Sequence, residues 1–438
     1  MSDTKSYGGV LDALVAGEWD DPATGAPVKI PIGSIAIERS LDGAEADLVA
    51  PFHRGKSILV VSDEITRAVL GARVVKALQP LGSVSEFVWE NPRCTAEGVE
   101  ELREKTRGAE ALIAIGSGTV SDSVKYATFL DGREYSVFPT SPMNAYTTPT
   151  ASVSFDGFKK SISCHSARGV FFDLEILAGC PERLVRAAFA DVICRTTAQV
   201  DWLMSHLLFD TPYSETPYVL LAYDEAHLLD TAGSLSSGSF DFLATLTRIA
   251  AIMGLGTSFT GTTHSGSMAE HMMSHYIDMF AGSAHPGTSH GEQVGVTTLT
   301  MSHLQNQILG AGAPLEVKPT EIPIDELTSR YGAEMAFTMQ QQTAQKAIDA
   351  GTAGRINARF AADWEGFAGQ LRKVMLPFER LDEAMARAGA QRTAAELGLD
   401  SGFYRDNIRH ARFTRDRFTI LDLAGDSGLL EAFAGSAG

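Results

Sequence analysis

Short apolar segments alternate with amphipathic ones from residue 56 to about 178, and this alternation limits the folds open to the chain. KSILVVSD (56–63) is an apolar segment of strand length, and residues 64–81 then carry apolar side chains at helical spacing. The same pair of patterns recurs as far as GVFFDLEIL (169–177). Strand–helix alternation at this spacing predicts a parallel sheet covered by helices on both faces. We therefore expect an α/β domain.

Beyond residue 178 the pattern is helical almost to the end of the chain. Residues 186–209 and 239–256 are long apolar segments with helical periodicity. A chain of 438 residues is long enough for two substantial cores. We expect an α/β domain at 1–178, in which residues 1–55 form an N-terminal decoration, and an all-α domain at 179–438.

Charge and cysteine content exclude several classes of protein. The net charge of -18 argues against nucleic acid, because binding a phosphate backbone requires a basic surface. The four cysteines form no CxxC pair, which is typical of reduced thiols. Neither a signal peptide nor an apolar run close to the ~20 residues of a membrane helix is evident. We expect a cytoplasmic protein that binds neither nucleic acid nor a membrane.

The motif GSGTVSD begins at Gly116, directly after the apolar segment ALIAI, and opens a predicted helix. Gly116 and Gly118 would let a ligand approach the backbone, and Thr119, Ser121 and the free amides of the helix start suit a pyrophosphate. Because the motif is not GxGxxG, a purely structural turn is the alternative. Asp63, which ends the earlier strand, suits either a ribose hydroxyl or a helix N-cap.

Six of the eleven histidines lie between residues 264 and 303. His271 and His275 are four residues apart and share one helical face, and His290 opens a further helix. Imidazoles suit zinc, and Asp191 interrupts an apolar stretch where a buried charge requires a partner or a metal. From spacing alone, these histidines could form either a polar helix face or a metal site. Spacing also does not show which of His271 and His275 would be the ligand. We interpret the others in this window as structural or surface residues: His264, His285 and His303.

Five motifs in this order resemble those of the iron-containing alcohol dehydrogenase superfamily, which includes glycerol dehydrogenase and 3-dehydroquinate synthase. They are GSGTVSD, PTSPMNAYTTP, FADVICRTTAQVDW, EHMMSHYIDM and HGEQVGV. The resemblance is strongest to the sn-glycerol-1-phosphate dehydrogenase family and runs from about residue 56 to 304. It implies a dehydroquinate synthase-like architecture, in which a Rossmann-like domain binds the dinucleotide, a helical domain binds metal and substrate, and a cleft lies between them.

The resemblance also implies roles for individual residues. Asp191, His271 and His290 would bind the metal, and His275 would contact the substrate instead. Zinc is the expected ion, with nickel, manganese and iron as alternatives. The cofactor would be NAD or NADP, with Asp63 favouring NAD. Its other predicted contacts are Gly116, Gly118, Thr119, Val120, Ser121, Asp122, Thr140, Ser141, Pro142, Met143 and Thr148.

The chain departs from the family in two places that concern the substrate. Asn144 and Ala145 stand where relatives usually have Asp and Gly, so a hydrogen-bonding group is kept but a charge is lost. HSGSMAEH replaces a stretch that reads more like PASGGEH in many relatives. Lys159 and Lys160 are the predicted cations for a substrate phosphate, with solvated surface lysines as the alternative.

The implied reaction interconverts a polyol phosphate and its ketone, with sn-glycerol 1-phosphate and dihydroxyacetone phosphate as the expected pair. Asp191, His275 and Asn144 would take part in catalysis. A dehydrogenase of a different or non-phosphorylated polyol is one alternative. Others are a carbon–oxygen lyase like 3-dehydroquinate synthase, which carries Glu at the first ligand position, and a cofactor-binding protein without activity. We expect a homo-oligomer.

Overall fold

The computed structural model describes residues 7–155 and 158–436, which form two compact units. Unit 1 contains the chain up to Ala188 together with Glu215–Thr262, and unit 2 contains Phe189–Ser214 and the chain from Thr263 onward. Each unit thus combines two stretches of sequence. The division at residue 178 is drawn along the chain and stays a prediction.

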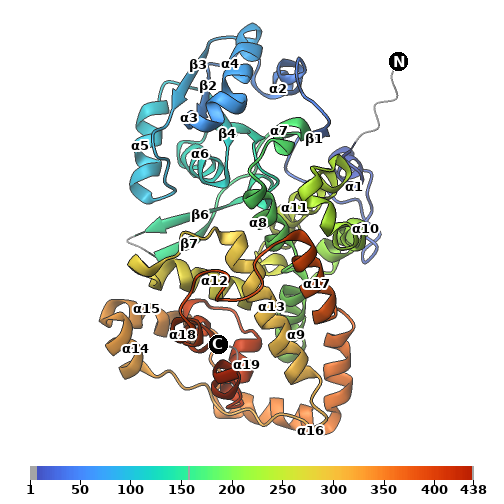
Figure 1. Ribbon diagram of the computed structural model, residues 1–438, viewed down its shortest axis with the longest axis vertical. Helices are drawn as coiled ribbons and strands as arrows, with labels where there is room; N and C mark the ends of the chain where they lie inside the picture. The colour runs from blue at the N-terminus through green and yellow to red at the C-terminus, as the bar shows by residue number, and fades with distance from the viewer. Residues whose placement is uncertain (1–6, 156–157, 437–438) are drawn as a thin grey trace. The chain divides into compact units, whose positions relative to one another are not determined.

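A parallel six-stranded sheet forms the centre of unit 1, as the alternation of segments predicts (Figure 1). Its strand order is β1-β8-β5-β4-β2-β3. The edge strand β1 lies in the segment expected to be a decoration and pairs with β8. The strands are β1 Ser34–Glu38, β2 Ile58–Ser62, β3 Val84–Val88, β4 Ala111–Gly116, β5 Glu134–Pro139 and β8 Gly169–Asp173.

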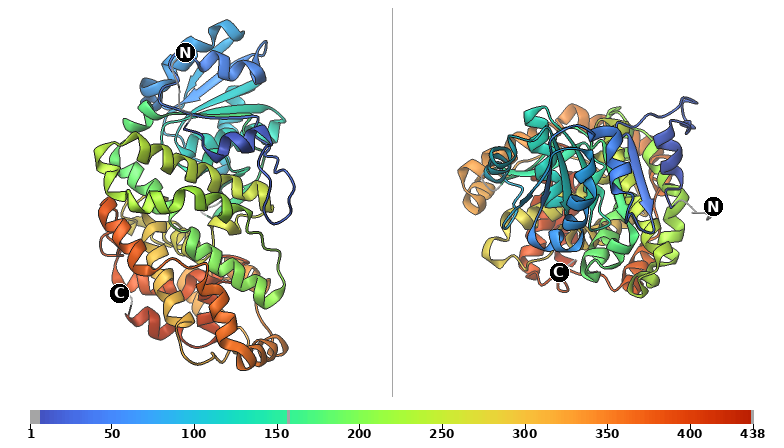
Figure 2. Two further views of the ribbon diagram at one scale, coloured as in Figure 1. Left: turned by 90° about the vertical axis from the view of Figure 1, so that its right-hand side faces the viewer. Right: turned by 90° about the horizontal axis from the view of Figure 1, so that it is seen from above.

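Helices cover both faces of this sheet (Figure 2). Every residue of β4 is buried, which requires a covering layer on each side. One face of β2 and β4 shares a hydrophobic cluster with α2 and α4, and α6 packs on β4 and β5 with α5 beside it. The helices of this part are α1 Val10–Ala16, α2 Glu45–His53, α3 Glu64–Thr66, η1 Arg67–Gly71, α4 Ala72–Leu78, η2 Gln79–Leu81, α5 Ala96–Thr106, α6 Gly118–Asp131 and α7 Leu174–Ala178.

Two features of unit 1 were not expected from the sequence. Strands β6 (Thr150–Phe155) and β7 (Phe158–Ser163) form an antiparallel pair outside the main sheet. Helices α10 (Thr216–Asp230) and α11 (Phe240–Thr260) belong to unit 1 although they follow the predicted boundary. The short helices η3 (Asn144–Tyr146) and η4 (Ala232–Ser237) contact α11.

The sequence shows no apolar run of membrane-helix length, but helix α11 of the structure passes a test of length and mean composition. This helix has 21 residues and is apolar enough to span a bilayer by length and composition. Arg248 and several threonines and glycines interrupt it, so no unbroken apolar run marks it in the sequence. Because 78% of its most apolar window is buried, α11 is a core helix of unit 1.

Unit 2 is helical, in agreement with the predicted pattern. Its core joins α9, α12 and α13 to the C-terminal helices through a cluster that includes Met272, Tyr276 and Phe360. Helices α12 and α13 pack directly on one another (Figure 1). The elements are α8 Glu182–Val192, whose last residues belong to this unit, α9 Arg195–Phe209, η5 His264–Gly266, α12 Ala269–Phe280, η6 Gly282–Ala284, α13 His290–Leu309, α14 Ile324–Tyr331, α15 Ala333–Ala344, α16 Ala350–Arg372, α17 Phe378–Ala388, α18 Ser401–His410, η7 Ala411–Thr414, α19 Ile420–Asp426 and α20 Leu430–Ser436.

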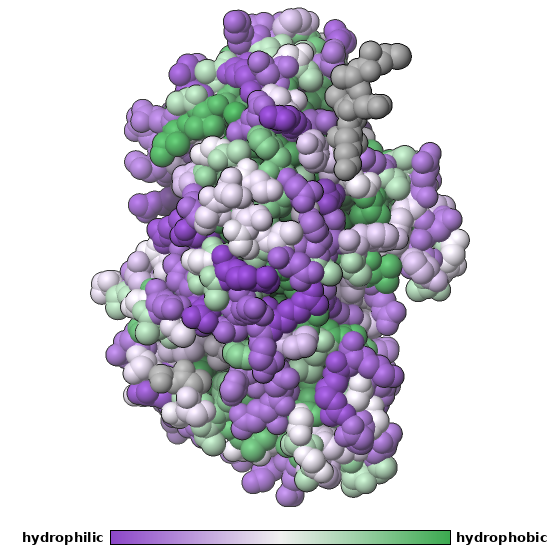
Figure 3. All heavy atoms as spheres, turned by 45° about the vertical axis from the view of Figure 1, so that its right-hand side comes forward, coloured by the Kyte–Doolittle hydropathy of each residue, from purple (hydrophilic) through white to green (hydrophobic). Residues whose placement is uncertain are grey.

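Hydrophilic residues predominate on the face of the molecule shown in Figure 3. This agrees with the composition of the chain, which has 54 acidic and 36 basic residues. In the described part of the chain, the exposed large hydrophobic side chains are Ile65, Val69, Phe129, Leu130, Tyr223 and Phe337.

Candidate functional site

Asp191, His271 and His290 converge in unit 2, from α8, α12 and α13 respectively. Oδ1 of Asp191 lies 3.8 Å from Nε2 of His271 and 3.9 Å from Nε2 of His290. One potential ligand atom from each of the three residues lies within 4.8 Å of the others. A carboxylate oxygen and two imidazole nitrogens at these separations can bind one divalent ion and leave a coordination position for another ligand.

A close approach between α13 and the end of α8 brings the carboxylate to the histidines. A Cβ atom on Gly295 of α13 would lie 2.7 Å from Cβ of Ala190 and 2.7 Å from Cε of Met385. Only glycine therefore allows this packing distance. Asp191 follows Ala190 directly and is 7% exposed, so its charge lies almost wholly in the protein interior.

Glu270 determines which nitrogen of His271 faces Asp191. Its Oε1 lies 3.0 Å from Nδ1 of His271. Burial acts to raise the pKa of Glu270, but the hydrogen bond with His271 and the amide of Met268 outweigh it and lower the pKa. An ionised carboxylate can only accept, so Nδ1 of His271 carries the proton and Nε2 presents its lone pair. Such carboxylate–histidine pairs are typical of metal sites.

A chain of hydrogen bonds determines the tautomer of His290 in the same way. Asp278 accepts from Nε2 of Gln293 (3.0 Å), which turns Oε1 of that amide toward Ser274. The Ser274 hydroxyl donates its one proton to this oxygen (2.8 Å). It must therefore accept from Nδ1 of His290, 3.0 Å away. The lone pair of His290 is then on Nε2, the nitrogen nearest Asp191.

His275 is in the opposite state. Nη2 of Arg415 lies 3.0 Å from Nδ1 of His275. A guanidinium has only donors, so Nδ1 accepts and the proton of the neutral ring is on Nε2. The ring centre of His275 lies 5.6 Å from that of His290 and 6.4 Å from that of His271. His275 thus lies beside the candidate ligands but offers a hydrogen-bond donor in place of a lone pair.

A second cluster, Cys194, Glu270 and His271, also has ligand-like spacing. Burial, with the charges of Glu270 and Asp191, raises the pKa of the Cys194 thiol well above its usual value. Its sulfur instead lies 3.4 Å from the carbonyl oxygen of Gly266. We therefore assign Cys194 to packing beside the Gly266 carbonyl.

The other histidines of the 264–303 window lie apart from the ligand cluster. His264 stacks on Trp202, and burial together with the Arg417 charge lowers its pKa to about 3. His285 contacts Asp278, and His303 is exposed.

The predicted cofactor residues gather at the carboxyl edge of the sheet in unit 1. Gly116 ends β4 and Pro139 ends the neighbouring β5, and the two are register partners. Gly116 has φ +136°, and a Cβ on it would lie 3.2 Å from the Thr66 side chain. The loop after β5 is tied to it, because Tyr146 donates to the Gly116 carbonyl (3.0 Å) and also bonds Ser141 (2.7 Å).

This edge has the features of a pyrophosphate site. Helix α6 starts at Gly118 without a side-chain cap, so its first amides are available to an anion. The hydroxyl of Ser121, in the first turns of α6, is buried and has no hydrogen-bond partner in the protein. A bound ligand can satisfy such a group. Thr119 and Val120 share this turn, and Thr140, Pro142 and Met143 follow β5.

Asp122 and Asp63 have structural partners. Both carboxylate oxygens of Asp122 are engaged, one with Lys125 (2.9 Å) and the other with the amide of Ser152 (2.9 Å). Asp63 caps α3 in a capping box with Thr66. The N-cap role foreseen as one alternative for Asp63 is therefore present, and a ribose contact stays a prediction.

The predicted substrate residues lie in both units. Asn144 begins η3, and Thr148 follows it and bonds Thr150 (2.9 Å). Lys159 and Lys160 lie on β7, and Nζ of Lys160 lies 5.6 Å from the ring centre of Phe155. All these residues belong to unit 1, whereas Asp191 and His275 belong to unit 2.

Glu270, Ser274, Gln293, Arg415 and Arg417 were not identified from the sequence. Glu270 and Ser274 neighbour predicted residues along α12, so helical adjacency was an available signal. The two arginines lie about 140 residues beyond His275, in FTRDRF, and carry no recognisable motif.

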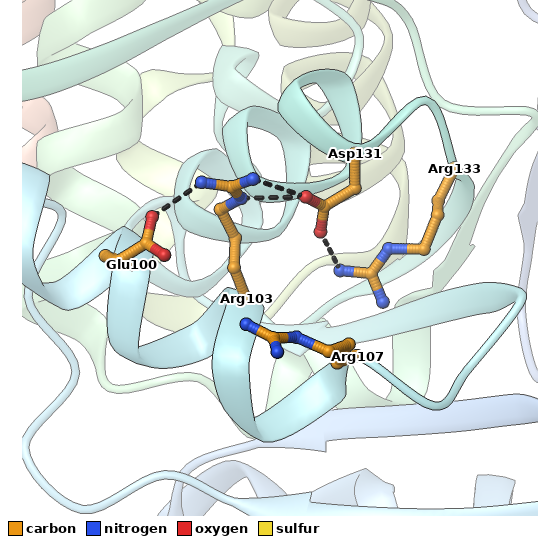
Figure 4. A pocket seen from close by; sticks show the side chains of 5 residues that line it. All are labelled: Glu100, Arg103, Arg107, Asp131 and Arg133. Carbon is orange, nitrogen blue, oxygen red and sulfur yellow. Dashed lines mark hydrogen bonds and ion pairs between the residues drawn. The ribbon is translucent and has the colours of Figure 1, made fainter.

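A pocket of about 200 Å³ in unit 1 is unrelated to the predicted cofactor site (Figure 4). Arg103 pairs with Glu100 and Asp131, and Arg133 pairs with Asp131. Asp131 ends α6, whereas the cofactor loop precedes the start of that helix, about 20 Å away for a helix of 14 residues. We assign these charges to stabilising the ends of α5 and α6.

Comparison with known proteins identifies the family. Residues 36–181 match the family model described as "Iron-containing alcohol dehydrogenase". The glycerol-1-phosphate dehydrogenase [NAD(P)+] of Methanothermobacter thermautotrophicus is 28% identical over 373 residues, 85% of this chain and 86% of the relative. That of Methanosarcina mazei is 30% identical over 249 residues, 56% of this chain and 69% of the relative. The chain belongs to the iron-containing alcohol dehydrogenase family.

A solved structure agrees with this assignment at the level of the fold. Glycerol dehydrogenase from Schizosaccharomyces pombe has a TM-score of 0.61 at 14% identity, covering 93% of this chain and 91% of that one. The protein is thus a dehydrogenase of an NAD(P)-dependent family that acts on CH–OH groups, with a candidate metal site.

Proposed function

We propose that the protein is a metal-dependent, NAD(P)-linked dehydrogenase that interconverts sn-glycerol 1-phosphate and dihydroxyacetone phosphate. The observation that carries the proposal is the group formed by Asp191, His271 and His290, in which both imidazoles direct a lone pair toward one carboxylate. The names of the relatives support the substrate and the cofactor.

The residues of unit 2 divide into ligands and a donor. Asp191, His271 and His290 would hold a divalent ion, with zinc preferred and nickel, manganese or iron as alternatives. When bound, such an ion supplies Lewis acidity to the oxygen of the reacting carbon. His275 would orient the substrate through the proton on Nε2, and Arg415 holds that tautomer.

Unit 1 would supply the cofactor site. The open amides of α6 and the Ser121 hydroxyl suit a pyrophosphate, and residues 140–143 and Thr148 would bound the nicotinamide half. Asn144 would contribute a hydrogen bond to the substrate. Asp63 would favour NAD over NADP through repulsion of a 2′-phosphate. We also propose a cytoplasmic homo-oligomer.

The decisive variant is Asp191→Ala. It removes the one carboxylate of the ligand group, so we expect loss of bound metal and at least a hundredfold loss of turnover. Metal content by mass spectrometry and reduction of dihydroxyacetone phosphate with NADH and NADPH measure the two effects. Asp325→Ala, at an exposed position in the first turn of α14, is the matched control. Unchanged metal content and turnover in Asp191→Ala would refute the proposal.

The same assay separates the alternatives. A dehydrogenase of a non-phosphorylated polyol would reduce dihydroxyacetone at least as well as its phosphate. A carbon–oxygen lyase would show no net turnover of cofactor with any ketose. Identification of the product as the sn-1 enantiomer, by its resistance to an sn-glycerol-3-phosphate-specific dehydrogenase, would complete the test.

A further inference from the structure

Two arginines lie beside His275 on the segment between η7 and α19. Arg415 contacts Nδ1 of His275 at 3.0 Å and donates from Nη1 to the Ser267 hydroxyl at 3.2 Å. Arg417 donates to the Ser267 carbonyl oxygen at 2.6 Å and to the Thr263 hydroxyl at 3.1 Å. Both guanidinium groups therefore contact the same residue, Ser267.

Arg417 has an unused binding edge. Nη1 of Arg417 donates both of the hydrogen bonds described above. Its Nε is buried and has no hydrogen-bond partner in the described part of the chain, where the Asp416 and Glu270 carboxylates act on it only through their charges. The Nε–Nη2 edge of a guanidinium is the face that binds two oxygens of a phosphate or carboxylate side by side.

The electrostatics of the pair also favour an anion. Burial, together with the positive charge of Arg417, lowers the pKa of Arg415 to about 9, although the charges of Asp416 and Glu270 act to raise it. Burial is likewise the main cause that lowers the pKa of Arg417. Two neighbouring cations repel one another and have lost hydration through burial. A bound dianion would offset both effects by its attraction to each guanidinium.

We propose that Arg417, with Arg415 beside it, binds the phosphate group of the substrate. This inference rests on the proposed polyol phosphate activity and deepens it. Only a few bonds separate the reacting oxygen of a triose phosphate from its phosphorus, so the phosphate site must adjoin the metal ligands. Arg415 meets this condition through its contact with His275, whose ring neighbours those of His271 and His290, and Arg417 is joined to Arg415 through Ser267.

The inference also explains one departure from the family. Ser267, which both arginines contact, belongs to the stretch HSGSMAEH that differs from many relatives. It is an alternative to the prediction that Lys159 and Lys160 bind the phosphate. Those lysines lie on β7 of unit 1, where one of them packs against Phe155.

The first measurement compares Arg417→Gln with the wild-type enzyme on two substrates. We expect the KM for dihydroxyacetone phosphate to rise ten- to a hundredfold, since a charge-assisted bidentate contact is lost. The kcat/KM for dihydroxyacetone, which has no phosphate, should change less than about twofold. Arg417→Lys, which keeps the charge but not the planar fork, should give an intermediate KM. Arg355→Gln on the surface of α16 is the matched control.

The second measurement does not depend on turnover. Calorimetry measures the affinity of the metal-loaded protein for inorganic phosphate. We expect at least tenfold weaker binding in Arg417→Gln and wild-type binding in Arg355→Gln, with unchanged circular dichroism and melting temperature in both. Phosphate bound equally by Arg417→Gln, or not bound by the wild type, would overturn the inference.

The two measurements separate the inference from the proposed function. Suppose that the enzyme reduces dihydroxyacetone phosphate but that Arg417→Gln has an unchanged KM, or that the KM rises in Lys159→Gln or Lys160→Gln instead. The proposed function then stands, and the arginine site is overturned. Absence of turnover together with loss of phosphate binding in Arg417→Gln overturns the function and supports the anion site.

Discussion

The hydrogen bond at Nδ1 determines whether each of three histidines can bind a metal or donate a proton. Glu270 and Ser274 hold the Nδ1 protons of His271 and His290, whereas Arg415 holds the Nδ1 lone pair of His275. The two states are mutually exclusive for a neutral ring. Two of the histidines are therefore prepared to bind a cation, and the third is prepared to donate a proton to an oxygen.

Ser274→Ala tests this division at the scale of one hydroxyl. The change removes the acceptor of the His290 Nδ1 proton, so that the ring loses its orientation and its preferred tautomer. We expect metal affinity to fall about ten- to a hundredfold, the usual effect of losing such an outer contact. Competition with a chromophoric chelator measures it. Ser302→Ala, a buried serine of α13 outside this hydrogen-bond chain, should bind metal as the wild type does. Equal affinities in the two variants would contradict the assignment.

Spacing along the sequence could not distinguish His271 from His275. Both lie on one face of α12 and both are buried. What separates them is Glu270 next to one and Arg415, 140 residues away, next to the other. The first partner is local and could be read from the sequence with attention to helical neighbours. The second depends on how η7 and α12 pack, which no pattern in a single sequence encodes.

The strand and helix segments of the sheet were predictable because each carries its own periodicity. Strands β2 to β5 and β8 are short apolar runs, and α5 and α6 carry helical spacing. The β6–β7 pair was missed because β7 (FKKSIS) lacks regular alternation and only Ala151 and Val153 of β6 are buried. The place of α10 and α11 in unit 1 was missed because helical periodicity does not state which core a helix joins.

Packing of α11 on the loop after β5 gives a prediction at the scale of elements. A Cβ on Gly254 would lie 2.1 Å from Oγ1 of Thr147 and 2.3 Å from the Asn144 carbonyl oxygen. Gly254→Ala should therefore displace this loop, lower the free energy of unfolding by about 1–3 kcal/mol and weaken NADH binding. Urea unfolding and fluorescence titration measure the two effects.

Gly354→Ala provides the control for that variant. Gly354 is an exposed residue of α16, and a Cβ there would meet nothing within 4 Å. Alanine should raise stability by up to about 1 kcal/mol through helix propensity and leave NADH binding unchanged. If Gly254→Ala kept wild-type stability and bound NADH tightly, the loop would tolerate displacement and the prediction would be contradicted.

Contact between α2 and the sheet makes unit 1 sensitive to acid. His53 is buried, and its Nε2 lies 2.8 Å from the Ser136 hydroxyl on β5. Burial, aided by the charge of Lys56, lowers its pKa from 6.5 to about 4. Between these values the unfolded chain binds the proton and the folded one does not, so stability is full above pH 6.5 and falls as the pH falls toward 4.

The expected loss over that interval is about 3 kcal/mol at most. His53→Gln, which keeps a hydrogen bond to Ser136 but does not titrate, should flatten the difference between stabilities at pH 7 and pH 4.5. Chemical unfolding at the two pH values measures it, and His303→Gln at an exposed position should retain the wild-type slope. A His53→Gln protein with the wild-type slope would assign the acid sensitivity to other groups.

For the whole molecule, the predicted cofactor residues and the candidate metal ligands belong to different compact units. The cofactor loop and its supporting loop after β5 belong to unit 1, and the metal ligands, His275 and both arginines belong to unit 2. Every hydrogen bond that we use to assign a histidine tautomer is internal to unit 2. Binding of each ligand should therefore leave a signature in its own unit.

Hydrogen exchange can resolve these signatures. Zinc at a hundred times its Kd should stabilise the site by about 2.7 kcal/mol and slow exchange in the end of α8 and the first turns of α12 and α13. NADH should instead slow exchange at the start of α6 and in residues 140–148. In Asp191→Ala the zinc effect should vanish and the NADH effect should remain, because the carboxylate belongs only to the metal half. Zinc protection confined to unit 1, or surviving in Asp191→Ala, would mean that the ion binds elsewhere.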